Sequence, residues 1–356
     1  MSLNKALGRV ATTLVAGAML TALAMPAYAA GVTTGTETEP VTSVTITKTV
    51  ETDDNTYAPN TTFNFTVTKG EEKSFNDGTS AVTAKAGVPG GLVAGNGAAF
   101  APVTKKDEKV VAPSAEYTAT ATLDVVDSVF EVPGIYHYVV TEANTSYEGV
   151  TKDNSTYDVY LYVYNNDDYN DLYVGHVVSV KNGATGDADA KADLIFTNRY
   201  TTGSVTVTKY VEGSFANMGD TFAFTVGVRG TEGEAYKVVY TQKDAPVTTF
   251  VESGKTIDVS GIGDEDTITI YGLSTNDSYT VTENDGVTRG YTVTDTVGDN
   301  DGQVSGTTST ARTASITNTK DATAPTGIVM NVAPYVLLVV VAAAGCFVFL
   351  RKRRED

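Results

Sequence analysis

The strongest constraint on this chain is an internal repeat. Four segments of the first half recur in the second half in the same order: SVTITKTV (43–50) as SVTVTKYV (204–211), TFNFTV (62–67) as TFAFTV (221–226), YVVTE (138–142) as YTVTE (279–283), and IFTN (195–198) as SITN (315–318). The chain is therefore predicted to contain two copies of one fold, joined near residues 200–203. The first copy is longer, and its extra length, mainly within 76–116, is predicted to form a long loop or an added hairpin.

Apolar and polar residues alternate with a period of two through most of the chain. Short segments rich in Val, Thr, Tyr and Ile are separated by Gly, Asn and Asp, which is typical of β-strands. The clearest segments are 44–50, 62–68, 157–164, 205–211, 221–228 and 267–271. Many short strands with frequent turns, and no convincing amphipathic helix between the two ends, predict an all-β fold of two tandem Ig-like β-sandwiches.

Charge and composition exclude several classes of protein. The 356 residues include 43 acidic and only 25 basic side chains, so the chain lacks the basic surface that nucleic acid binding requires. The one cysteine, Cys346, cannot form an intrachain disulfide, and the two histidines, His137 and His176, are too few for most histidine metal sites. The polar runs at 165–168 and 299–302 are interpreted as turns, since the second lacks the first ligand and the closing Glu of a calcium loop. We expect no metal and no cofactor.

Both ends of the chain have the pattern of export signals. Lys5 and Arg9 precede an apolar run that ends in Ala-Tyr-Ala at 27–29, which predicts a secretory signal peptide over residues 1–29. Near the C-terminus an apolar run at 328–350 is followed by four basic residues at 351–354. That run is long enough to span a bilayer, and its basic flank would stay inside the cell.

Three kinds of polar residue are predicted to point into the core of each copy. In the strand at 44–50, Lys48 alternates with the Thr residues and shares its face with Val44, Ile46 and Val50. The same count along the other repeated segments gives one Lys, one Glu and one Asn per copy: Lys48, Glu142 and Asn198 in the first, and Lys209, Glu283 and Asn318 in the second.

A buried ammonium group needs a partner, and three arrangements would supply one. The Lys and Glu could form a buried ion pair with the Asn beside it, or each Lys could extend from a strand end to water. The third arrangement is a covalent Lys–Asn isopeptide bond. Burial would then keep the amine neutral and nucleophilic, while a protonated Glu polarises the Asn amide and transfers protons as ammonia leaves. Because the triad occurs twice in the same order, we favour the covalent bond.

These residues resemble those of Gram-positive pilins of the streptococcal type, which are built from CnaB-like and FctA-like domains. The triads, the Thr-Asn strand endings and the C-terminal tail carry the resemblance, which covers nearly all of the secreted part. In that family an isopeptide bond joins the first and last strands of each sandwich, and a Glu assists. The resemblance thus implies two bonds, Lys48–Asn198 assisted by Glu142 and Lys209–Asn318 assisted by Glu283. It also implies domains at 41–200 and 203–319 and a cell-wall sorting signal at 323–356.

The sorting signal departs from the commonest form of that motif. Residues 323–327 read Thr-Ala-Pro-Thr-Gly directly before the apolar span, so the Leu of L-P-x-T-G is absent and Pro stands one place later. The form x-V-P-T-G of streptococcal-type pilins is closer. The resemblance implies that a sortase cysteine attacks the carbonyl of Thr326, releases Gly327 onward, and yields the acyl group to an amine. A plain membrane anchor is the alternative.

An exposed lysine of a second subunit would turn this transfer into polymerisation. Lys191 is the candidate, because the linking lysine of the family also lies shortly before the bond-forming Asn, and because alternation over the seven residues to Asn198 directs it outward. Lys181 is the competitor, and either could be an ordinary solvated lysine.

The sequence therefore predicts a secreted, wall-anchored pilin subunit whose only chemistry of its own is autocatalytic bond formation. Its expected partners are a sortase, other copies of itself and cell-wall peptidoglycan, with minor pilins or a host surface as further candidates. A wall-anchored adhesin that uses the same two domains without polymerising is the alternative. An enzyme ectodomain has the least support, since we find no zinc-protease motif, phosphate-binding glycine loop or nucleophile elbow.

Overall fold

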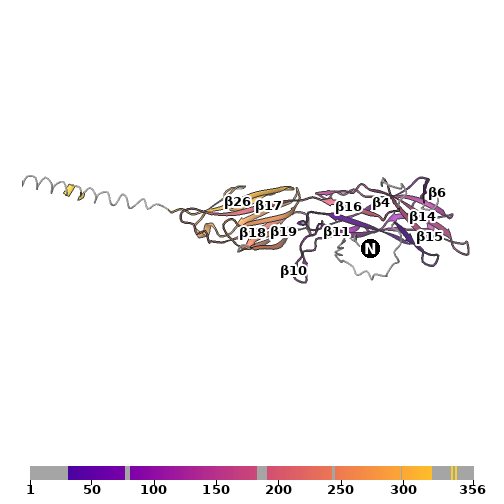
Figure 1. Ribbon diagram of the computed structural model, residues 1–356, viewed down its shortest axis with the longest axis horizontal. Helices are drawn as coiled ribbons and strands as arrows, with labels where there is room; N and C mark the ends of the chain where they lie inside the picture. Colours follow the sequence, from indigo (N-terminus) through magenta and orange to yellow (C-terminus); the bar gives the residue numbers. More distant parts are fainter. Residues whose placement is uncertain are drawn as a thin grey trace, which may run out of the picture.

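The computed structural model describes residues 31–76, 81–182, 191–242, 245–297, 299–322, 338–339 and 341–342. The predicted signal peptide and the motif at 323–327 lie outside the described residues. Within the part of the chain that is described, no helix is both long enough and apolar enough to cross a membrane. Figure 1 shows strands throughout both copies, which confirms the prediction of an all-β fold of tandem sandwiches.

Two sheets packed face to face form the first sandwich. One sheet has the order β1 (Val32–Thr34), β15 (Leu172–Lys181), β14 (Thr156–Asn165), β12 (Gly134–Glu142), β6 (Ala81–Ala86) and β5 (Lys73–Asn76), with β4 (Phe65–Lys69) also paired to β12. The facing sheet has the order β13 (Val150–Thr151), β16 (Ile195–Tyr200), β2 (Ser43–Glu51), β11 (Glu116–Val125) and β7 (Leu92–Ala94). Inward residues of both sheets, such as Ile46, Leu123 and Val140, form one apolar core, as the alternation predicts.

The second sandwich is built in the same way from fewer strands. One sheet has the order β20 (Ala245–Glu252), β19 (Ala235–Gln242), β22 (Thr267–Leu273), β17 (Gly203–Glu212), β26 (Ala311–Thr319) and β24 (Thr292–Asp295). The other has the order β21 (Lys255–Ile262), β18 (Phe222–Arg229), β23 (Ser278–Glu283) and β25 (Gln303–Thr307). The described part of the chain also contains two single-turn 3-10 helices, η1 (Asp127–Val129) and η2 (Val287–Arg289).

In each sandwich an early strand and the last strand lie side by side in parallel. Residue 196 of β16 is in register with Lys48 of β2, and residue 316 of β26 is in register with Lys209 of β17. Each triad Asn lies two residues beyond its register position, on the same face of the sheet. Lys and Asn are therefore diagonal neighbours, at a separation that long side chains can bridge.

The extra length of the first copy folds differently from the expectation. Residues 76–116 contain β6, β7, β8 (Ala98–Phe100), β9 (Lys105–Lys106) and β10 (Lys109–Val110), of which only β9 and β10 form a separate hairpin. The predicted strand 62–68 is divided at Asn64 into β3 (Thr61–Phe63) and β4, because β3 pairs with β8 and β4 pairs with β12.

The outer face of the larger sheet is also covered, so residues on both faces are buried there and burial no longer alternates along the strand. Ala84 of β6 packs on that face against Tyr160, Val178 and Val180. Asp158 is buried on the same face, where its carboxylate lies 2.9 Å from His137 Nε2 and accepts a hydrogen bond from Lys73. Strand β14 is therefore buried on both sides, which a simple alternating pattern does not predict.

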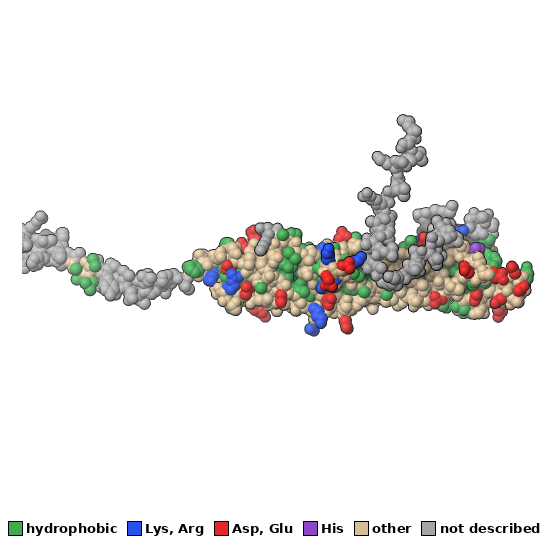
Figure 2. All heavy atoms as spheres, turned by 90° about the horizontal axis from the view of Figure 1, so that it is seen from below, with side chains coloured by type: hydrophobic (Ala, Val, Ile, Leu, Met, Phe, Trp, Pro, Cys, Tyr) green, Lys and Arg blue, Asp and Glu red, His purple; other side chains and the backbone are tan. Residues whose placement is uncertain are grey.

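The two sandwiches lie end to end in one elongated molecule (Figure 1). Polar contacts join them: the Tyr147 hydroxyl donates to the Glu234 carboxylate, and Lys237 Nζ donates to Asn55 Oδ1 at 2.8 Å. Figure 2 shows acidic side chains to be more common than basic ones at the end of the molecule away from the C-terminal tail.

Candidate functional site

In the first sandwich one buried carboxylate contacts both a lysine and an asparagine. Lys48 Nζ donates to Glu142 Oε2 at 3.0 Å, and Asn198 Nδ2 donates to Glu142 Oε1 at 2.6 Å. Lys48 and Asn198 are fully buried and Glu142 is 2 % exposed, so water is excluded from all three side chains. Lys48 Nζ also donates to the carbonyl of Phe196 at 3.3 Å.

The two sheets contribute different members of this triad. Lys48 lies in β2 and Asn198 in β16, the parallel pair of one sheet, whereas Glu142 ends β12 of the facing sheet. The carboxylate therefore reaches across the sandwich and approaches both partners at once. The alternating pattern predicts this meeting because all three positions face inward.

The second sandwich repeats the arrangement, with a longer lysine–carboxylate distance and a slightly shorter asparagine–carboxylate hydrogen bond. Asn318 Nδ2 donates to Glu283 Oε1 at 2.5 Å, while Lys209 Nζ lies 3.4 Å from Glu283 Oε2 as an ion pair. Lys209 Nζ donates to the carbonyl of Tyr210, on its own strand, at 2.8 Å. The three side chains are buried, and Glu283 again comes from the facing sheet, at the end of β23.

Burial shifts the pKa values of both triad lysines and of Glu283 toward their neutral forms. Desolvation lowers the pKa of Lys48, although the nearby Glu142 opposes the shift. In the second triad desolvation lowers the pKa of Lys209 to about 8, against the attraction of Glu283. Desolvation also raises the pKa of Glu283, against its contacts with Asn318 and Lys209. In the second triad these shifts favour a neutral amine beside a protonated carboxyl group, the state that nucleophilic attack on an amide requires.

A group that sequence analysis missed completes the first triad. The backbone N–H of Asp153, in the loop between β13 and β14, donates to Asn198 Oδ1 at 2.7 Å. Nothing in the local sequence identifies this donor, because a backbone group carries no residue signature. Among the described residues, Asn318 Oδ1 of the second triad has no hydrogen-bond partner.

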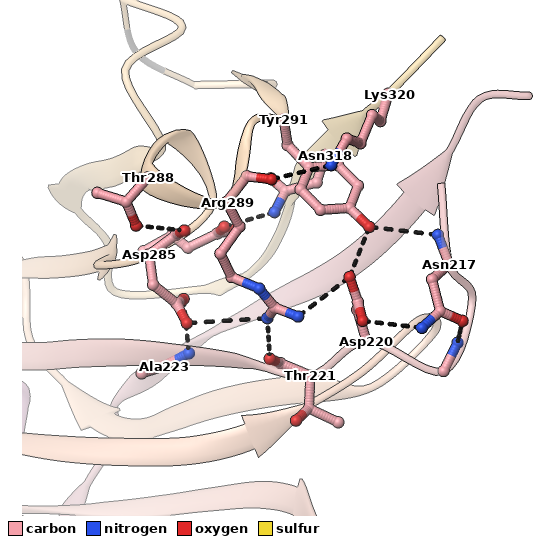
Figure 3. A network of polar contacts seen from close by, with 12 residues as sticks. Asn217, Asp220, Thr221, Ala223, Asp285, Thr288, Arg289, Tyr291, Asn318 and Lys320 are labelled. Atoms are coloured by element: carbon pink, nitrogen blue, oxygen red, sulfur yellow. Dashed lines mark hydrogen bonds and ion pairs between the residues drawn. The ribbon is translucent and has the colours of Figure 1, made fainter. Parts of the chain in front are cut away.

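A loop after β23 closes the second triad instead (Figure 3). Arg289 of this loop forms an ion pair with Asp220 at 3.0 Å and donates to the carbonyl of Thr221 at 2.5 Å. At Gly286 an added Cβ would lie 2.1 Å from Glu283 Oε1 and 2.7 Å from Asn318 Nδ2. Only a residue without a side chain lets the loop approach the triad so closely.

The candidate linking lysines are less exposed than expected. The outward direction predicted for Lys191 assumed one continuous strand to Asn198, which is wrong: β16 begins at residue 195, and Lys191 instead forms an isolated bridge with Val180 of the opposite sheet. The Lys191 side chain is half-buried. Lys181 is also half-buried, with its Nζ 5.7 Å from the centre of the Tyr157 ring. Thr326 and Gly327 lie outside the described residues.

Comparisons with known proteins identify relatives for both sandwiches. Residues 44–201 match the model of the Spy0128-like isopeptide containing domain (FctA), and residues 203–320 match a domain of unknown function (DUF7601). A curated pilin from Streptococcus pyogenes serotype M1 is 30 % identical over 253 residues, which cover 66 % of this chain and 72 % of that protein.

Solved major pilins of Streptococcus pyogenes have the same fold. The T3.2 pilin matches with a TM-score of 0.59 and 21 % identity, over 82 % of this chain and 100 % of that chain. A second major pilin matches with a TM-score of 0.53 and 23 % identity, over 79 % of this chain and 99 % of that chain. At these identities the likeness concerns the architecture, and the sequence match to the curated pilin carries the relationship.

Proposed function

This chain belongs to the family of pilins that contain a Spy0128-like isopeptide domain, and from that premise we propose that it is the repeating subunit of a pilus shaft, polymerised covalently by a sortase and stabilised by two internal isopeptide bonds. The observation that carries the proposal is the contact of one buried carboxylate with both a lysine amine and an asparagine amide. That arrangement occurs once in each sandwich.

The bond-forming step follows from the contacts of each Glu. The neutral Lys48 amine attacks the side-chain carbonyl carbon of Asn198, and the new C–N bond forms as the bond to Nδ2 breaks. Glu142 accepts a proton from the attacking amine and delivers one to Nδ2, so ammonia leaves and the carboxyl group returns to its starting state. The product amide is neutral, which removes the cost of a buried charge. Lys209, Glu283 and Asn318 have the same roles in the second sandwich.

The positions of the two bonds suit a fibre under tension. Each bond would join β2 to β16 or β17 to β26, which are neighbouring parallel strands near the start and end of their sandwich. Force applied along the chain would then pass through a covalent crosslink. The hydrogen-bond ladders between those ends would not carry the load.

Polymerisation would use the acyl group of Thr326 and a lysine of the next subunit. Lys191 is proposed as that lysine and Lys181 as the competitor, since the isolated bridge from Val180 to Lys191 places both at the end of β15. Transfer to peptidoglycan in place of lysine would anchor the finished fibre to the cell wall.

Intact-mass measurement tests the internal bonds. The recombinant chain is expected to lack the mass of one ammonia for each bond, hence two in total. Glu142→Gln and Glu283→Gln are matched controls that should each restore one ammonia while keeping the packing volume. A mass equal to that of the sequence would refute the bonds.

Wall extracts test the polymer. The unmodified chain should give a ladder of high-mass species, which Lys191→Arg should abolish and Lys181→Arg should leave intact. A ladder lost only with Lys181→Arg would reassign the linking residue. If the unmodified chain is anchored but forms no ladder, the adhesin alternative is correct.

A further inference from the structure

The loop between β13 and β14 places a backbone donor on the reacting carbonyl of the first triad. The Asp153 N–H lies 2.7 Å from Asn198 Oδ1, the oxygen that becomes negatively charged when an amine adds to that amide. Donors aimed at such an oxygen stabilise the tetrahedral intermediate, and removal of one from an enzyme lowers the rate about 10²–10³-fold. We propose that the Asp153 N–H is an oxyanion donor for formation of the Lys48–Asn198 bond, an inference that rests on the proposed isopeptide chemistry.

The Asp153 side chain holds that donor in position. Its Oδ2 accepts a hydrogen bond from the backbone N–H of Thr197 at 2.7 Å, directly beside Asn198, and its Oδ1 accepts from Ser155 N at 2.7 Å. These contacts lower the pKa of the carboxyl group although burial opposes the shift, so the clamp is ionised at neutral pH. The carboxylate therefore fixes the loop to β16, the strand that carries the reacting amide.

Lys152 fixes the same loop from the other side. Its Nζ donates to the carbonyl of Glu142 at 3.1 Å, at the end of the strand that supplies the triad carboxylate. The N–H of Asp153 is thus held between the strand of the general acid–base and the strand of the electrophile. Such a donor needs no reorganisation when charge develops on the oxygen.

The second triad provides an internal comparison. Asn318 Oδ1 has no hydrogen-bond partner among the described residues. Asp264 instead contacts the lysine strand, since its Oδ1 accepts from Val211 N of β17 at 2.8 Å, and it brings no N–H to the Asn318 carbonyl. We therefore expect the first bond to form faster than the second in the same molecule.

A time course of bond formation tests the assignment. The full chain is synthesised in a cell-free system with detergent, quenched in denaturant at intervals and digested, and the Lys48–Asn198 and Lys209–Asn318 crosslinked peptides are quantified by mass spectrometry. Asp153→Ala keeps the backbone N–H but loses the side-chain contacts that hold it in position. It should therefore slow formation of the first bond by roughly tenfold or more and leave the rate of the second bond unchanged. Asp153→Asn removes the same charge but keeps one of the two accepting oxygens, so it should slow the first bond less than Asp153→Ala does.

One control variant and one readout of the hydrogen bond itself accompany the time course. Asp264→Ala removes a loop carboxylate that contacts β17 of the second sandwich, and it should leave the maximum rate of the Lys209–Asn318 bond, measured over a range of pH, unchanged. In the unsubstituted protein, the Asp153 amide hydrogen should exchange slowly with solvent although it lies in a loop, which is a readout that needs no variant.

The outcomes are distinct. An Asp153→Ala chain that forms the first bond at the normal rate, a loss that Asp153→Asn shares in full, or rapid exchange of the Asp153 amide would each overturn the oxyanion assignment. Absence of both crosslinked peptides from the unsubstituted chain would instead overturn the proposed function.

Discussion

The two triads contain the same residues but differ in their surroundings. In the first triad Lys48 Nζ lies 3.0 Å from Glu142 Oε2, and the Asn198 carbonyl oxygen accepts a hydrogen bond. In the second triad Lys209 Nζ lies 3.4 Å from Glu283 Oε2, and the Asn318 carbonyl oxygen has no donor among the described residues. The loop that contains Asp153 is hydrogen-bonded to β16 and covers the first triad. The loop that contains Gly286 lies directly against the second triad, and an ion pair between Arg289 and Asp220 holds it there. The two sites therefore share their three inward side chains and differ in the loops that surround them.

Removal of a crosslink should have the largest effect, and the loss of stability should be nearly equal in the two sandwiches. Asn198→Ala and Asn318→Ala each remove one crosslink, and a crosslink that closes a loop of roughly a hundred residues stabilises by about 5 kcal/mol. Because that stabilisation depends only logarithmically on loop length, the longer first loop should add little. Calorimetry of the two variants should show one transition lowered in each, with the other domain unchanged. Strongly unequal losses would show that the surroundings, not only the crosslinks, determine stability.

A methyl group at Gly286 should affect the second sandwich alone. Gly286→Ala brings Cβ into Glu283 and Asn318, and overpacking of an interior costs up to about 3 kcal/mol. The displaced Glu283 should also slow the Lys209–Asn318 bond. Denaturant unfolding and the crosslinked-peptide assay measure the two effects. Gly219→Ala is the control, because neither Gly286 nor Gly219 has a positive φ and the Cβ added at Gly219 would meet only Asn217 Oδ1, at 3.5 Å. Equal losses in both variants would remove the packing argument.

A buried carboxylate distinguishes the first sandwich on its outer face. Hydrogen bonds from His137 and Lys73 outweigh burial and lower the pKa of Asp158 to about 2. Since the folded pKa lies below the unfolded value, this stabilisation is complete above about pH 4 and is lost as the pH falls toward 2. Asp158→Asn should therefore lower the free energy of unfolding by about 2 kcal/mol at neutral pH, and the difference from the unsubstituted protein should shrink below pH 4. A difference that persists at pH 2 would contradict this cause.

The smallest effect concerns the pH dependence of the second bond. The reactive Lys209–Glu283 pair carries one proton, which it loses above the lowered pKa of Lys209 at about 8. Below the raised pKa of Glu283 it carries two protons and the amine is no longer a nucleophile. The rate of crosslinking should therefore have a maximum between these limits and fall about tenfold per pH unit outside them. A rate that keeps rising above pH 9 would show that Glu283 does not supply a proton.

The alternation of apolar and polar residues correctly predicted which triad side chains face inward. It gave a wrong direction where the count ran past the end of a strand. Lys48, Lys209 and both Glu residues lie within regular strands, so their direction follows from the count. Lys191 does not, because residues 192–194 connect two sheets and break the count. The burial of Asp158 was also missed, since a hairpin distant in sequence covers its face. Periodicity describes one strand and its two faces, and it carries no information on what later packs against them.

The sequence by itself determined two β-sandwiches, each with one amine, one carboxyl and one carboxamide directed inward, because strand geometry makes every second residue face the core. The tertiary structure decided that a single carboxylate approaches both partners in each core, and that only the first carbonyl receives a donor from the described residues. Those contacts join strands of opposite sheets and a loop clamped to the last strand. Their geometry arises from packing over long sequence separations, which no local pattern encodes.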